Sequence, residues 1–222
     1  MSMLDPTIAP EMATTPMGYE QFLAWIDEDF HAEWVDGEVQ FVSPASNRHQ
    51  DLARFLTAVL SIFTETNQPG GVRPAPFQMR LAESSREPDI LFLTKDHLNR
   101  LKKTYLDGPT DLVIEIISPE SVGRDRGDKL YEYEANGVVE YWLVDPQRRW
   151  AEFYLLDTDA GRYRLAFEGK TGRYQSEVIA DFWFRVEWLW EEPLPAIDEI
   201  MLDIGGAEYA ERWIELLRGS YL

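Results

Sequence analysis

A strand, a helix and a second strand follow one another directly in this sequence, and that order limits the folds open to the chain. Residues 111–118 read DLVIEIIS, a short branched-aliphatic run typical of a buried strand, and EYWLVDP at 140–146 is a second such run. The stretch from about residue 125 to residue 135 has helical spacing, and Asn136-Gly137 is expected to end that helix in the left-handed conformation. The unit predicts two parallel strands joined by a right-handed crossover.

Helical and strand patterns continue on both sides of this unit. Helices are expected at 18–29, 47–65 and 207–219, and strands at 77–83, 89–94, 151–156, 162–168, 174–179 and along the alternating aromatic run 182–190. Asp36-Gly37 between two apolar runs predicts a hairpin turn. The predicted fold class is α/β (α+β), a mixed β-sheet flanked by helices with a trailing antiparallel β-meander. We expect a flexible N-terminal segment at 1–16, a single domain at 17–204 and a C-terminal amphipathic helix at 205–222.

The chain of 222 residues contains no cysteine, which excludes a disulfide scaffold, a zinc–thiolate site and a cysteine nucleophile. Its N-terminus has neither the positive region nor the apolar region of a signal peptide. No run approaches the roughly 18 consecutive apolar residues that a membrane helix needs. We therefore expect a cytoplasmic protein without a membrane segment.

Forty acidic residues against 21 basic ones give a formal net charge of −19. Such a charge repels polyanions at long range, which argues against nucleic-acid binding. It also favours cation sites, because clustered carboxylates attract divalent metals. A local positive rim could still form from eight basic residues: Arg48, Arg54, Arg73, Arg80, Arg86, Lys95, Lys102 and Lys103.

Glu115 stands in the middle of the aliphatic run 111–118, where an isolated ionised carboxylate would be very costly. It must be paired, neutralised or bound to a metal. Asp89 opens another predicted strand, and neighbouring strands lie about 4.8 Å apart, so the two carboxylates can meet over one cation. With Mg²⁺ or Mn²⁺ and Lys129 from the crossover helix, this set suffices for phosphodiester hydrolysis, because the metal activates water and the ammonium stabilises the transition state.

These residues, in this order, resemble the PD-(D/E)XK nuclease superfamily, and a longer set of motifs resembles its Uma2 branch of restriction-endonuclease-like proteins. The set spans about residues 15–191 and comprises EWVDGE (33–38), Ser43-Pro44, His49, Pro88-Asp89, DLVIEIISP (111–119), Asp125, Lys129, Tyr133, Gly137-Val138 and EYWLVDP (140–146). The resemblance implies a restriction-endonuclease-like fold that cleaves DNA with Mg²⁺ or Mn²⁺. Its implied metal ligands are Asp89, Glu115 and Glu38. It also implies a homodimer, because enzymes of this superfamily often pair to cut both strands.

The superfamily pattern has a lysine two residues after the strand glutamate, and that position is Ile117 here. Ile117 shares the face of Glu115 but brings no charge. The resemblance implies that Lys129 on the following helix takes over this role. His49 and Asp125 are secondary candidates for the site.

Each of these residues also has a structural interpretation. Asp89 could form a local turn, Glu115 a buried ion pair, and Glu38 a surface charge of the hairpin. Two hypotheses therefore follow: a metal-dependent endonuclease acting on DNA, or a nuclease fold that has lost its activity and serves as an interaction or assembly module. Ile117 and the net charge favour the second.

Overall fold

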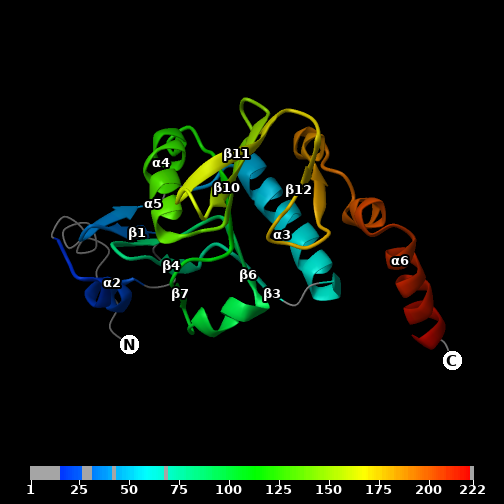
Figure 1. Ribbon diagram of the computed structural model, residues 1–222, viewed down its shortest axis with the longest axis horizontal. Helices are drawn as coiled ribbons and strands as arrows, with labels where there is room; N and C mark the ends of the chain where they lie inside the picture. The colour runs from blue at the N-terminus through cyan, green and yellow to red at the C-terminus, as the bar shows by residue number, and fades with distance from the viewer. Residues whose placement is uncertain (1–15, 27–31, 42–43, 68–69, 221–222) are drawn as a thin grey trace.

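The computed structural model describes residues 16–26, 32–41, 44–67 and 70–220 (Figure 1). Of the N-terminal segment expected at 1–16, only Pro16 falls within these ranges. The described strands form sheets of six, five and two strands. The long helix expected at 47–65 is present as α3 (Asn47–Asn67).

The strand–helix–strand unit lies at the centre of the six-stranded sheet, as the sequence predicts. β8 (Leu112–Ile116) and β9 (Glu140–Asp145) are parallel neighbours. The single helix expected between them is two helices, α4 (Val122–Arg126) and α5 (Asp128–Asn136), because Gly127 leaves the helical conformation; Gly137 ends α5 with a φ of 85°. The other strands of this sheet are β3 (Gly70–Pro74), β6 (Ile90–Thr94), β10 (Trp150–Asp157) and β11 (Arg162–Gly169). The strand order is β11-β10-β9-β8-β6-β3, and every pair other than β8–β9 is antiparallel.

The predicted hairpin opens the five-stranded sheet. β1 (Ala32–Val35) pairs with β2 (Glu38–Phe41), and φ angles of 49° at Asp36 and 89° at Gly37 form the two-residue turn. The strand order is β2-β1-β5-β4-β7, and only 78–80 of the strand expected at 77–83 is extended. The remaining elements of this part are α2 (Tyr19–Trp25), which packs on the hairpin, β4 (Gln78–Arg80), β5 (Ser84–Arg86), β7 (Tyr105–Asp107) and the 3-10 helix η1 (Lys95–Arg100).

Side-chain alternation along β8 divides the core into two. Ile114 and its even-numbered neighbours point toward α3 and belong to the larger apolar cluster. Val113 points to the opposite face, toward α5 and the five-stranded sheet. Figure 1 shows α3 and α5 on opposite sides of the six-stranded sheet. Because Glu115 shares the face of Val113, its carboxylate lies under α5.

The C-terminal third departs from the predicted meander. β9, β10 and β11 form consecutive antiparallel pairs, but Gly169 and Gly172 have positive φ angles and the chain turns away after β11. Of the strand expected at 174–179 only β12 (Arg173–Gln175) forms, and it pairs with β13 (Trp183–Arg185). The strand expected over 182–190 is also too long, since η2 (Val186–Trp190) is a 3-10 helix that buries its tryptophans by a tight turn rather than by alternation.

The C-terminal segment contains the expected helix and an additional helical stretch before it. α6 (Ile197–Ser220) is interrupted by a non-helical residue, Gly206, at a φ of 56°, and the stretch after Gly206 corresponds to the helix expected at 207–219. Ile200 and Met201 pack into the larger apolar cluster, while Figure 1 shows the rest of α6 leading away from the sheets to the C-terminus. Among the described residues, no helix combines the length and apolar content needed to cross a membrane.

Candidate active site

Asp89 and Glu115 lie side by side because of the register between β6 and β8. Ile90 pairs with Ile114 in this antiparallel ladder, so Asp89, one residue earlier, is opposite Glu115. Directly opposed residues have Cβ atoms about 4.5–5.5 Å apart and point to the same face of a sheet. Backbone pairing thus brings together two residues that the sequence predicted for the site.

A histidine and a backbone amide fix the carboxylate of Asp89. Its Oδ2 accepts a 2.6 Å hydrogen bond from Ile116 N and lies 3.2 Å from Nε2 of His49, near the start of α3. Burial acts to lower the pKa of His49, but the hydrogen bond and charge of Asp89 outweigh it and raise that pKa. The structure therefore places His49 in the site, where it orients Asp89.

Lys129 lies between buried carboxylates. Its Nζ is 2.9 Å from Oε1 of Glu115 and 3.0 Å from Oε1 of Glu33, and Oδ1 of Asp125 is 3.7 Å away. Oε1 of Glu115 also accepts a 2.8 Å hydrogen bond from the hydroxyl of Tyr133. The lysine thus reaches back from α5 to the strand glutamate, and it forms the buried ion pair at the same time.

Arg86 holds Glu33 from the other side. Nη1 of Arg86 donates to Oε2 of Glu33 at 3.1 Å, and Nη2 lies 2.6 Å from Oε2 of Glu132. Glu132 in turn accepts a short hydrogen bond from Ser84. Among the described residues, Glu33 therefore has two cationic partners, Lys129 and Arg86, whereas Glu115 has Lys129 alone.

The pKa values follow this unequal sharing of positive charge. Burial acts to raise the pKa of Glu33, but Lys129 and Arg86 lower it to about 2. Burial raises the pKa of Glu115 to about 8; Lys129 opposes this shift, and the nearby carboxylates add to it. Burial acts to lower the pKa of Lys129, but Glu115 and Glu33 hold it above its ordinary value. Glu33 thus stays ionised between its two cationic partners, whereas Lys129 does not fully offset the effect of burial on Glu115.

One cavity of about 560 Å³ is bordered by Glu33, His49, Asp89, Glu115 and Lys129. Among the described residues that line it, carboxylates outnumber cations, because Arg124 and Lys129 are the basic ones and the acidic ones are Glu33, Glu87, Asp89, Glu115, Glu120 and Asp125. Such a lining attracts cations.

The donor atoms of this cavity suit a divalent cation. Oδ1 of Asp125 is buried without a hydrogen bond, and both hydrogen bonds to Glu115 end on Oε1, so Oε2 is not used by them. Within the described ranges, no three His, Cys, Asp or Glu side chains are grouped closely enough to form a metal site by themselves. Mg²⁺ needs no such group, since it commonly takes one or two carboxylates and keeps several waters. Asp89 and Glu115 are the two carboxylates that would hold the ion in such an arrangement.

The structure does not bring Glu38 to the cavity. Glu38 is exposed next to the hairpin turn, where it pairs with Val35. It shares a face of the hairpin with Glu33, but Glu33 pairs with Gln40, farther from the turn. The acidic residue of this hairpin that lines the cavity is Glu33.

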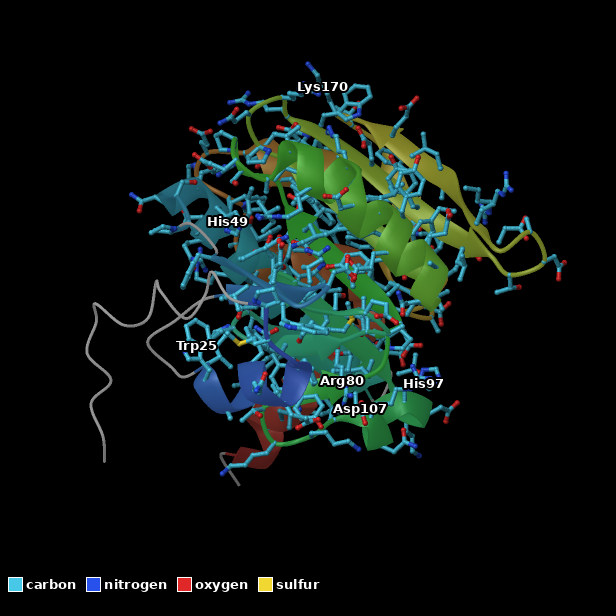
Figure 2. The ribbon with its side chains drawn as sticks, turned by 90° about the vertical axis from the view of Figure 1, so that its left-hand side faces the viewer. Trp25, His49, Arg80, His97, Asp107 and Lys170 are labelled. Atoms are coloured by element: carbon cyan, nitrogen blue, oxygen red, sulfur yellow. The ribbon has the colours of Figure 1, made fainter. Side chains whose placement is uncertain are left out.

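The predicted basic rim is not assembled around the cavity either. None of its eight members is among the described residues that line the cavity. Arg86 is buried in the ion pairs with Glu33 and Glu132, and Arg48 donates to the carbonyl of Leu189. Figure 2 shows Arg80 beside Asp107 and well away from His49.

Two residues of the site were missed by the sequence analysis. Glu33 is a carboxylate within an apolar strand, which is the same pattern that identified Glu115. The sequence pattern could therefore have identified Glu33 as well. Arg124 carries no such signal, because an arginine between Gly123 and Asp125 is typical of a solvated helix. Only the fold places Arg124 on the cavity.

The comparisons with known proteins agree with this fold and these motifs. No curated protein matches the chain. Among solved structures, the chain is similar to a putative nuclease belonging to DUF820 from Anabaena variabilis, with a TM-score of 0.66 and 14% sequence identity over 79% of this chain and 98% of that chain. At this identity the likeness concerns the fold. The Uma2 family model, described as putative restriction endonuclease, matches residues 19–187 and confirms the resemblance seen in the sequence. The match runs from α2 into η2, and the chain therefore belongs to the Uma2 family of putative restriction endonucleases.

Proposed function

We propose that this protein is an endonuclease that hydrolyses DNA phosphodiester bonds with Mg²⁺ or Mn²⁺. The observation that carries the proposal is the convergence of Asp89, Glu115 and Lys129 on one acidic cavity in a chain of the Uma2 family. The fold by itself would not suffice, because one fold hosts many functions.

Each residue has a defined part in this proposal. Asp89 and Glu115 would hold the metal ion, which supplies a water of lowered pKa and positive charge against the phosphoryl group. Lys129 orients Glu115 through their 2.9 Å contact and adds a fixed positive charge at the cavity. His49 orients Asp89. Ile117 packs among apolar residues, so α5 rather than β8 supplies the cation.

A catalytically inactive interaction module is the second candidate. One observation favours it: the Lys129 side chain is only 4% exposed, and its ammonium already contacts two carboxylates. In that case the network would be a structural ion cluster, and metals would not change the behaviour of the protein toward DNA. The two candidates therefore differ in their response to metals.

We expect the purified protein to nick or linearise supercoiled plasmid in Mg²⁺ or Mn²⁺ and to leave it intact in EDTA, because Asp89 and Glu115 need the cation. Gel conversion of the plasmid over time measures this, with single-stranded DNA and RNA assayed in parallel to define the substrate class. Metal-stripped protein should recover activity when either ion is added back. Cleavage in EDTA would contradict the metal role, and no cleavage with any metal would favour the inactive module.

We also propose that the chain forms a homodimer through the end of α6. Every residue from 211 to 219 is exposed, including Trp213, Ile214, Leu216 and Leu217. Their spacing puts these apolar side chains on one side of the helix. A helix end of this length is only marginally stable in water unless its apolar face is packed. A partner is therefore expected on this face.

Charge favours a second copy of the chain in antiparallel orientation. Glu211 and Arg218 lie in one row with Ile214, since these residues are spaced i, i+3 and i+7. In an antiparallel pair, Glu211 of one copy meets Arg218 of the other, and the two-fold axis repeats the contact. The apolar face and its charged border are thus complementary to themselves.

We expect a dimer in sedimentation velocity for the unmodified chain and a monomer for Leu217→Glu. Glu211→Arg should weaken the dimer by placing like charges together, and the double change Glu211→Arg, Arg218→Glu should restore it. Glu208→Arg, the same change on the polar side of α6, is the control and should leave the dimer intact. A monomeric unmodified chain, or a double reversal that fails to restore pairing, would contradict the proposal.

A further inference from the structure

Arg124 differs from the other cations near the cavity because, within the described ranges, it forms no ion pair with a carboxylate, although its charge acts on the neighbouring Asp125. It lies on α4 and lines the cavity, and its Nε is buried without a hydrogen bond to any of the described residues. By contrast, Nη2 of Arg126 lies 3.4 Å from Asp145 and 3.2 Å from Glu152. Lys129 is held by its own carboxylates. The guanidinium of Arg124 is thus a cation that the described protein groups leave available.

The neighbouring residue has the opposite deficit. Oδ1 of Asp125 is buried without a hydrogen bond and lies 3.7 Å from Nζ of Lys129, while Asp125 adjoins Arg124 and lines the same cavity. The charges of Asp125 and Arg124 act on each other, but the two side chains form no hydrogen bond with each other. They fit a ligand of mixed charge, with a cation toward the carboxylates and an anionic oxygen toward the guanidinium.

We propose that Arg124 binds a backbone phosphate of the nucleic acid inside the cavity. This inference rests on the proposed function. A guanidinium offers parallel N–H groups that match two oxygens of one phosphate, and it carries its charge at every relevant pH. A chain of net charge −19 repels DNA, so a cation at the cavity is needed to hold the phosphate near Asp89 and Glu115.

The test compares Arg124→Ala and Arg124→Lys with Arg162→Ala, which makes the same charge change at an exposed residue of β11 outside the cavity lining. Steady-state cleavage of a short duplex gives KM and kcat, and fluorescence anisotropy in Ca²⁺ gives the salt dependence of binding. For Arg124→Ala we expect KM to rise about tenfold and the slope of log K against log salt to fall by about 1. The KM of Arg124→Lys should lie between those of the unmodified protein and Arg124→Ala, because lysine keeps the charge but lacks the paired N–H groups of the guanidinium. Arg162→Ala should have the same KM as the unmodified protein.

The outcomes separate this inference from the proposed function. If the unmodified protein cleaves DNA and Arg124→Ala has the same KM as Arg162→Ala, the phosphate-binding role is overturned and the endonuclease stands. If the unmodified protein neither binds nor cleaves DNA, the proposed function falls and this inference falls with it. The melting temperature of Arg124→Ala should stay at or above that of the unmodified protein, since the change removes an unpaired buried donor. A lower melting temperature with an unchanged KM would assign Arg124 a structural role instead.

Discussion

Replacing Asp89 by asparagine is expected to lower kcat/KM for metal-dependent DNA cleavage on the order of 1000-fold, which corresponds to about 4 kcal/mol of transition-state stabilisation. The loss is large because Asp89 is one of the two carboxylates proposed to hold the metal. Asparagine keeps the shape of the side chain, and its Oδ1 can still accept the hydrogen bond from Ile116 N. The fold should therefore survive, and thermal unfolding measured beside the kinetics checks that it does.

Two comparisons make this result specific. Asp96→Asn is the same chemical change on an exposed carboxylate of η1, outside the cavity lining, and should leave cleavage unchanged. Raising the Mn²⁺ concentration should recover part of the activity of Asp89→Asn, because a weakened metal site refills by mass action. Full activity in Asp89→Asn would remove Asp89 from the metal site. A loss that no metal concentration reverses, together with a lower melting temperature, would assign Asp89 a structural role.

Local patterns were sufficient to predict the centre of the fold. The strand–helix–strand unit, α3 and the hairpin at Asp36-Gly37 each follow from a periodicity or a turn signal that spans a few residues. The break at Gly127 did not follow, because a single glycine inside a helical pattern is usually tolerated. The strands expected at 174–179 and 182–190 were too long, because alternation indicates burial and a 3-10 turn can also bury alternating tryptophans.

The site was predictable to the extent that its residues lie on those local elements. Asp89 and Glu115 open or occupy predicted strands, so the sequence allowed them to meet, and the antiparallel pairing of β6 with β8 brings them together. Lys129 lies on the helix that the crossover packs over Glu115. The choice of Glu33 over Glu38 depends on how β1 sits against β5, a pairing of residues about 50 positions apart that no local pattern reveals. Long-range register is therefore the part of the site that the sequence could not supply.

Lys129 has two functions that a single substitution would confuse. It is proposed to serve the reaction, and it also neutralises buried carboxylates that would otherwise be unpaired. The two carboxylates, Glu115 and Glu33, differ in how far they depend on a cationic partner. Burial raises the pKa of Glu115 above its ordinary value even beside Lys129, so Glu115 takes up a proton more readily still when this cation is removed. Glu33, with a pKa of about 2, stays ionised and depends on Lys129 and Arg86. The energetic penalty of losing Lys129 should therefore fall mainly on Glu33.

Lys129→Met is accordingly expected to lower the free energy of unfolding by about 3–5 kcal/mol, the usual cost of leaving a buried charge without its partner. Adding Glu33→Gln should recover more of this loss than adding Glu115→Gln, because Glu115 can neutralise itself by protonation. Urea unfolding at neutral pH measures the single and double variants. Lys170→Met, the same change at an exposed lysine seen at the margin of the molecule in Figure 2, should change stability by no more than about 0.5 kcal/mol. Neither double variant should regain DNA cleavage, since both lack the ammonium. If Glu115→Gln proves the better rescue, Glu115 rather than Glu33 is the ionised partner that Lys129 stabilises.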